Sequence, residues 1–111
     1  MDDVLRALES SSMPLDDHDR VDRRPGIYRF SQPGRWLYVG SSNDMGRSVG
    51  DHMSGAGSAD LYDYILANRG RMRISWKRLH LPPAETSKIA DALVEEYLPR
   101  FNDNGLARWG L

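Results

Sequence analysis

The sequence has 111 residues, of which 40% are hydrophobic and 28% charged, so it can form one compact core and is too short for two. The absence of cysteine excludes disulfides, thiolate catalysis and thiolate zinc sites, and it agrees with a reducing compartment. No apolar run approaches the ~20 residues of a membrane span. The first residues also lack the basic start and apolar stretch of a signal peptide, so we expect a cytoplasmic protein with no membrane partner.

The net charge of −1 conceals two parts of opposite sign. Residues 1–22 carry seven acids and two bases, whereas residues 23–111 carry nine acids and thirteen bases. A mildly basic body is compatible with nucleic-acid binding, and arginine, its main base, suits bidentate contact with phosphate. A genomic preference for arginine codons would explain the same composition. We divide the chain into an acidic leader with a short helix, residues 1–24, and a folded domain, residues 25–111.

The first half of the chain is expected to hold a short helix and a β-hairpin. Apolar residues at helical spacing predict an amphipathic helix over residues 3–9, and the polar residues 13–24 that follow predict a loop. Residues 27–30 and 36–39 are typical of two strands, joined by turn residues at 31–35.

Two helices are expected after the hairpin. The first begins near Asn43 or Asp44, whose side chains can cap its free amides. The second begins near Ser58 or Asp60 and is predicted to end at Gly70 in the left-handed conformation.

The clearest alternation in the chain lies at residues 71–77. Met72, Ile74 and Trp76 point one way, which predicts a third strand with one solvated, basic face. The basic residues of that face, which either bind a phosphate backbone or are simply solvated, are Arg71, Arg73 and Lys77. A last helix spans about residues 84–98. The order ββααβα predicts an α/β (α+β) fold, with a small three-stranded, mostly antiparallel sheet flanked by helices.

One constellation of residues points to chemistry. Residues 26–28 (Gly-Ile-Tyr) are followed by residues 38–40 (Tyr-Val-Gly), and the second tyrosine comes ten residues after the first. His52 follows on the next predicted helix, and the last helix leads into residues 99–102 (Pro-Arg-Phe-Asn). Together these segments resemble the GIY-YIG endonuclease family over about residues 25–102. Each triplet is a weak signal alone, but the spacing makes the combination specific.

The resemblance implies hydrolysis of DNA phosphodiester bonds with one divalent ion, Mg²⁺ or Mn²⁺ if the protein is active. It also implies a role for each matching side chain. Tyr28 and Tyr38 would act around the nucleophilic water and the phosphate, and His52 would contact the phosphate or relay a proton. Asn102 would brace the site by hydrogen bonds.

Strand parity supports this pairing of tyrosines. Ile27, Leu37 and Val39 alternate with the tyrosines, so these aliphatic side chains can share one face of the sheet while both phenols point to the other. Each residue also has a purely structural interpretation: tyrosines pack well in strands, a histidine can be solvated, and an asparagine can serve a turn.

Two positions depart from the family pattern. The arginine expected ten residues after the second tyrosine is Ser48, and the metal-binding glutamate expected twelve residues before Asn102 is Ala90. Arg47, next to the first position, is either a displaced phosphate ligand or a solvated residue. No carboxylate shares the helical face of Ala90, so the metal ligand is unknown.

Three interpretations therefore stay open. The chain is a metal-dependent DNA endonuclease of GIY-YIG type, acting on single-stranded, duplex or branched DNA. Alternatively, it is a catalytically silenced GIY-YIG fold that binds nucleic acid or a protein partner. In the third case, Ser48 or Ala90 is an engineered substitution that abolishes activity.

Overall fold

The computed structural model describes residues 2–102. Its elements in chain order are α1 (Asp2–Ser10), β1 (Met13–Pro14), the 3₁₀ helix η1 (Leu15–Arg20), β2 (Gly26–Gln32), β3 (Arg35–Ser42), α2 (Met45–Ser54), α3 (Ala59–Asn68), the 3₁₀ helix η2 (Arg69–Arg71), β4 (Arg73–Arg78) and α4 (Pro83–Tyr97). From β2 onward this is the predicted order ββααβα. Within residues 2–102, none of the helices has the length and apolar character that a bilayer crossing requires.

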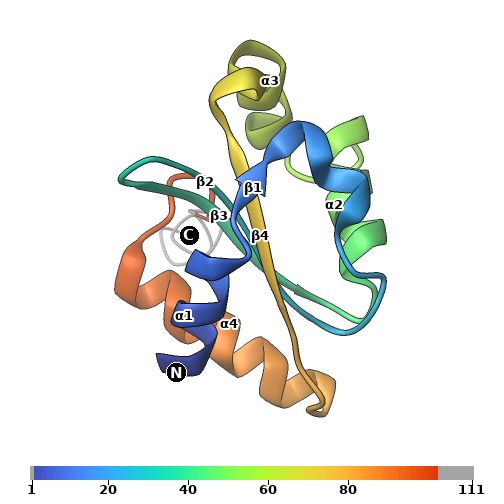
Figure 1. Ribbon diagram of the computed structural model, residues 1–111, viewed down its shortest axis with the longest axis vertical. Coiled ribbons are helices and arrows are strands. Elements are labelled where there is room, and N and C mark those ends of the chain that lie inside the picture. Colours follow the sequence, from blue (N-terminus) through green and yellow to red (C-terminus); the bar gives the residue numbers. More distant parts are fainter. Residues whose placement is uncertain (1, 103–111) are drawn as a thin grey trace, which may run out of the picture.

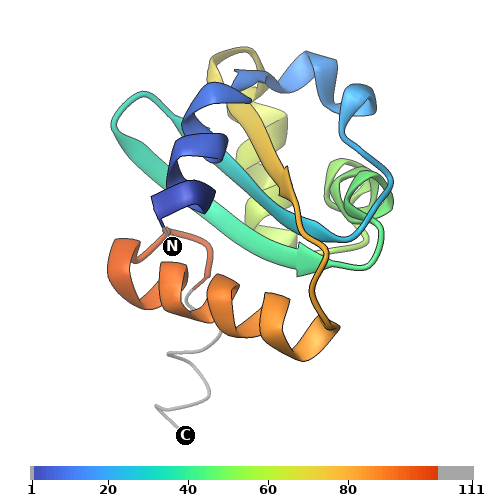
Figure 2. The same ribbon diagram turned by 60° about the horizontal axis from the view of Figure 1, so that its bottom comes forward.

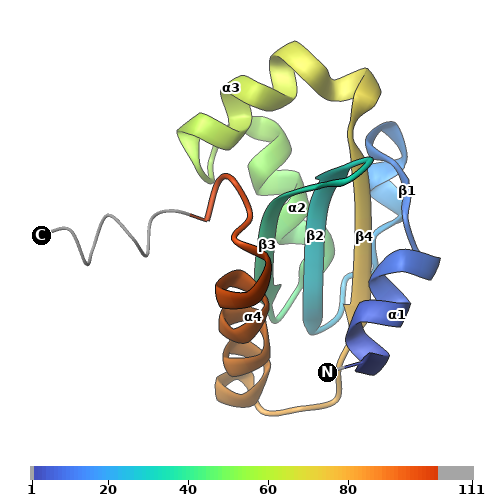
Figure 3. The same ribbon diagram turned by 90° about the vertical axis from the view of Figure 1, so that its left-hand side faces the viewer.

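The sheet has four strands where three were predicted. Its order is β1-β4-β2-β3 and every pairing is antiparallel, as Figures 1 and 3 show. The added strand β1 is only two residues long, with Met13 opposite Ile74 and Pro14 opposite Arg73. The predicted loop at residues 13–24 therefore contains an edge strand and η1. A two-residue strand has no periodicity to detect, and Pro14 fits there because an edge strand can leave one amide unpaired.

Helices cover both faces of the sheet, giving three layers. On one face α1 and α4 pack through Val4, Leu8 and Leu93 against Ile27 and Val39. On the other face η1, α2 and α3 enclose the larger core, whose fully buried members include Leu15, Met45, Val49, Leu61 and Ile65. Figure 2 shows α1 and α4 together, on the opposite side of the sheet from α2.

A β-bulge turns the side chain of Leu37 to the face of the sheet opposite the one predicted. Phe30 pairs with Tyr38 but Ser31 pairs with Trp36, so Leu37 is an extra residue in β3. Leu37 consequently packs in the same core as the tyrosines and not on the opposite face. Ile27 and Val39 do lie on that opposite face, as predicted.

The helix starts agree with the sequence, but one helix end does not. Asp44 accepts from the Arg47 amide and Ser58 from the Leu61 amide, as N-caps should. Gly70 is not a left-handed cap, because α3 ends at Asn68 and the chain continues directly into η2.

The solvated basic face predicted for residues 71–77 is also wrong. Strand β4 begins at Arg73, so Arg71 lies outside it in η2. Helix α1 packs on this face of β4, where Ser75 is fully buried and Arg73 and Lys77 are half-buried. The acidic leader thus supplies a helix that covers the surface expected to face water.

Candidate functional site

The two tyrosines and the histidine singled out by the sequence lie together beneath α2. Tyr28 on β2 and Tyr38 on β3 stack with ring centroids 6.3 Å apart. His52 reaches them from α2, with centroids 4.8 Å from Tyr38 and 5.8 Å from Tyr28. Val49, one turn before His52, is buried in the same core, so one face of α2 carries both the packing and the imidazole.

Tyr28 and His52 form a buried hydrogen-bonded pair. The Tyr28 hydroxyl lies 2.9 Å from His52 Nε2, and the two residues are only 3% and 7% exposed. His52 Nδ1 is buried with no hydrogen-bond partner among residues 2–102. Gly57, in the turn between α2 and α3, lies directly over this ring: a Cβ there would be 2.3 Å from Nδ1.

Gly40 permits the close packing of the first tyrosine. It is paired with Tyr28 across the hairpin, and a Cβ at position 40 would lie 2.4 Å from both Cζ and the hydroxyl of Tyr28. The Tyr-Val-Gly triplet therefore needs glycine because the neighbouring phenol occupies the space of a side chain.

Burial keeps all three rings neutral at physiological pH. It raises the pKa of Tyr28 well above the ordinary value near 10, and the charges of Tyr38 and Asp51 add to that rise while the Ser48 hydroxyl opposes it. Burial also raises the pKa of Tyr38. For His52, burial lowers the pKa below its ordinary value of 6.5, against a smaller opposing effect of Asp51. Neither phenol is therefore poised to act as a phenolate base.

The lowered pKa of His52 predicts acid-sensitive stability. Below pH 6.5 the unfolded chain binds a proton at this histidine that the folded chain rejects, so the free energy of unfolding should fall as the pH drops. His52→Gln should remove this contribution. Urea unfolding of both proteins at pH 5.0 and 7.5 measures it. A wild-type loss between these pH values no larger than that of the variant would contradict the prediction.

Asn102 braces β3 and makes no hydrogen bond to the rings. Its Oδ1 accepts from the Val39 amide at 2.7 Å and its Nδ2 donates to the Val39 carbonyl at 2.9 Å. The preceding residues continue this edge pairing, with the Phe101 amide donating to Leu37 and the Arg100 amide to Trp36. The chain after α4 thus holds the strand segment that carries Tyr38.

Asn102→Ala should lower the free energy of unfolding by about 2 kcal/mol, because both backbone groups of Val39 lose a partner in a half-buried setting. Asn102→Asp keeps the acceptor for the Val39 amide but sets a carboxylate oxygen against the Val39 carbonyl, so it should not restore the wild-type stability. The exposed Asn43→Ala provides the control. Denaturant midpoints that match for all three variants would rule out the bracing role.

The two positions that depart from the family pattern lie on different sides of the sheet. Ser48 on α2 donates from its hydroxyl to Ser42 at 2.6 Å and lies beside Tyr28. Arg47 is exposed, and its backbone amide donates to the N-cap side chain of Asp44. Ala90 is 5% exposed and belongs to the apolar cluster between α4, α1 and the sheet.

The residues around position 90 do not fit a divalent metal ion. Residues 2–102 contain no group of three or more His, Cys, Asp or Glu side chains able to hold one. Oxygen-rich coordination is what Mg²⁺ and Mn²⁺ require, whereas the neighbours of Ala90 are the apolar Ile27, Val39 and Leu93.

The candidate basic residues do not join the tyrosines. Arg71 donates to Asn68 beside η2, and Arg73 donates to Ser12 on the far side of the sheet. Lys77 pairs in register with Ile27, whose side chain faces α1 and α4. No sequence pattern marked Ser42 or Gly57, because both approach the site only through the tertiary fold.

Comparison with solved structures identifies the architecture. The GIY-YIG N-terminal endonuclease domain of UvrC from Thermotoga maritima, bound to its catalytic magnesium ion, matches with a TM-score of 0.62 and 12% identity, covering 78% of this chain and 93% of that one. Two point variants of that domain, a Tyr→Phe and an Asn→Ala, match equally well at 13% and 12% identity. The chain has the GIY-YIG fold. No protein-family model and no curated protein sequence matches it.

The GIY-YIG fold explains why the predicted cluster exists. Its hairpin and following helix bring Tyr28, Tyr38 and His52 into contact, and its last helix returns Asn102 to the hairpin edge. At this level of identity the likeness establishes the fold.

Proposed function

We propose that this chain is a nucleic-acid-binding domain of GIY-YIG fold that does not hydrolyse phosphodiester bonds with a divalent metal. The observation that carries the proposal is the burial of Ala90, where the family pattern places a metal-binding glutamate. A methyl group packed among aliphatic side chains on the face opposite the tyrosines offers no ligand for an ion.

The state of the aromatic cluster supports the same proposal. General-base catalysis near neutral pH works best with a group whose pKa lies near the working pH. Burial moves the pKa of Tyr28 and Tyr38 upward and that of His52 downward. Tyr28 and His52 are also hydrogen-bonded to each other and buried. We therefore assign them to stabilising the contact between the hairpin and α2, and not to binding a phosphate.

Nucleic acid is the ligand class that the fold and the charge favour. The matched solved domain is an endonuclease domain, and residues 23–111 of this chain carry thirteen bases against nine acids. Arg47 is exposed on α2 and precedes Ser48, whose hydroxyl bonds to that of Ser42, and such hydroxyls can contact a phosphate oxygen. Ser48 would then replace a cationic contact with a neutral one, which weakens but does not abolish phosphate binding.

Fluorescence anisotropy with labelled single-stranded, duplex and branched DNA in EDTA tests the binding. We expect affinity that falls as salt rises from 50 to 200 mM, because bound phosphates release counterions. Arg47→Gln should weaken binding several-fold, whereas Arg6→Gln, an exposed change on α1, should not. Undetectable or salt-insensitive binding to all three DNA forms would reject the nucleic-acid role and favour a protein partner.

A further inference from the structure

A second polar cluster lies on the face of the sheet opposite the tyrosines. It lines a groove of about 600 Å³ between α1 and the turn of the β2–β3 hairpin. Three arginines contribute to its walls, Arg29, Arg35 and Arg73, and Glu9 is the one acidic residue among them. Its volume falls within the range of small-molecule sites.

Arg29 is buried and held in place from three sides. It is 4% exposed, and its guanidinium donates to Glu9 at 2.9 Å, to the Leu8 carbonyl at 3.3 Å and to Ser75 at 3.2 Å. It also lies 4.7 Å from the ring centroid of Trp36. Trp36 is fixed in turn by parallel stacking on Tyr97 of α4 at 4.1 Å.

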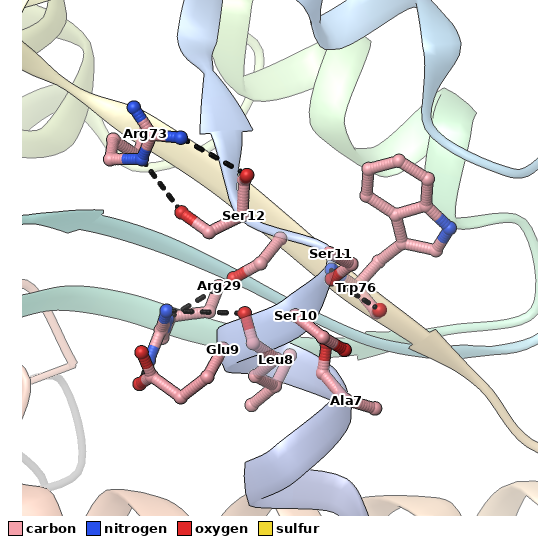
Figure 4. Close-up of polar contacts among 10 residues, drawn as sticks. Ala7, Leu8, Glu9, Ser10, Ser11, Ser12, Arg29, Arg73 and Trp76 are labelled. Atoms are coloured by element: carbon pink, nitrogen blue, oxygen red, sulfur yellow. Dashed lines mark hydrogen bonds and ion pairs between the residues drawn. The ribbon is translucent and has the colours of Figure 1, made fainter.

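Arg73 is fixed beside it on the neighbouring strand. Its guanidinium donates to the Ser12 hydroxyl at 2.7 Å and to the Ser12 carbonyl at 3.0 Å. Figure 4 shows Arg29 bonded to Leu8 of α1 and Arg73 bonded to Ser12, which lies between α1 and β1. Ser31, opposite Arg73 in the sheet and 5% exposed, also lines the groove.

Burying a guanidinium is costly unless its charge is compensated. Glu9 compensates Arg29 only in part, because the Glu9 side chain is 71% exposed to water. Arg35 is exposed and makes no ion pair with any described residue. The groove therefore holds an excess of two positive charges over its one carboxylate, and each guanidinium has five N–H donors.

We infer that this groove binds a phosphate group, carried either by a nucleotide-sized molecule or by a nucleic-acid strand. The net charge of the groove matches a phosphate monoester, and planar guanidinium groups bind phosphate oxygens in pairs. Arg29 and Arg73 are already ordered, so little side-chain entropy is lost when an anion enters. The inference concerns a site separate from the tyrosine cluster and does not depend on the function proposed above.

Two probes test the inference: inorganic pyrophosphate, followed by calorimetry, and a labelled 12-nucleotide single strand, followed by anisotropy. The variant Arg35→Gln/Arg73→Gln should weaken binding of at least one probe about tenfold. The control Arg6→Gln/Arg71→Gln removes the same charge outside the groove and should bind as the wild type does. If the double variant does not fold, Arg35→Gln alone provides the test, because this residue is exposed in the hairpin turn. Its affinity for the probe should be several-fold lower than that of the wild type.

The outcomes separate this inference from the proposed function. Loss of pyrophosphate binding in the groove variant with retention in the control supports the site, whether or not the strand binds. Loss of strand binding alone supports a nucleic-acid phosphate as its ligand. If the wild type binds the strand and the groove variant matches the control for both probes, the site is rejected while the proposed function stands. A wild type that binds neither probe rejects the site, and it rejects the proposed function only if duplex and branched DNA also fail to bind.

Discussion

Gly40→Ala should destabilise the domain by about 3 kcal/mol. A methyl group at this position would lie 2.4 Å from Cζ and the hydroxyl of Tyr28, and 2.9 Å from Cε1. The ring cannot easily retreat, because it is 3% exposed and packed between Phe30, Tyr38 and His52. Overpacking a rigid core costs free energy through shifted backbone and distorted rotamers. Thermal and urea unfolding measure the loss.

Gly50→Ala is the matched control for this prediction. Gly50 lies inside α2, and no atom comes within 4 Å of a Cβ placed there. Alanine should therefore stabilise the helix by about 0.5–1 kcal/mol. The double variant Gly40→Ala/Tyr28→Ala should lose less than the sum of its single changes, because the clash disappears with the ring. A neutral Gly40→Ala, or strict additivity, would contradict the close-packing explanation.

Ala90→Glu should lower the free energy of unfolding by about 3 kcal/mol or more. Ala90 is 5% exposed and shares its cluster with Val4, Leu8, Ile27 and Val39, so a carboxylate there would be buried among aliphatic side chains. Restoring the family's glutamate would thus disturb the packing of α1 and α4 on the sheet. The exposed Ala84→Glu on the same helix should change stability by less than 0.5 kcal/mol or so.

Manganese sharpens the test of position 90. If Ala90→Glu folds as stably as the wild type and gains thermal stability in Mn²⁺, the residue faces a latent metal site and not an apolar core. We expect neither effect. Combining the change with Ser48→Arg should not recover a metal response, because Ser48 lies on the other side of the sheet from the Ala90 cluster.

The parts of the fold that follow from local pattern were predictable from the sequence. The hairpin, the N-caps at Asp44 and Ser58 and the last helix each have a signature within a few residues. Strand β1 and the bulge at Leu37 do not, because they depend on pairing between distant segments. The predicted end of α3 was wrong because the chain continues into the 3₁₀ helix η2, which needs no left-handed residue at Gly70.

The same division applies to the sites. The cluster of Tyr28, Tyr38 and His52 was predicted from the resemblance to the GIY-YIG family, with hairpin parity in support of the two tyrosines, and the three rings do lie together. The arginine groove was not, since Arg29 is an ordinary polar residue in an alternating strand until α1 folds over it. Burial of Ala90 by an N-terminal helix is likewise a tertiary fact that local spacing does not contain.

A single-turnover cleavage assay tests the central claim most directly. Labelled single-stranded, duplex and branched DNA is incubated with excess protein and Mn²⁺, at a concentration at which anisotropy shows the DNA to be bound. We predict bound and intact DNA after many hours, in Mn²⁺ and in EDTA alike. Cleavage that needs Mn²⁺ and is lost in the Tyr38→Phe variant would contradict the claim and establish a working nuclease.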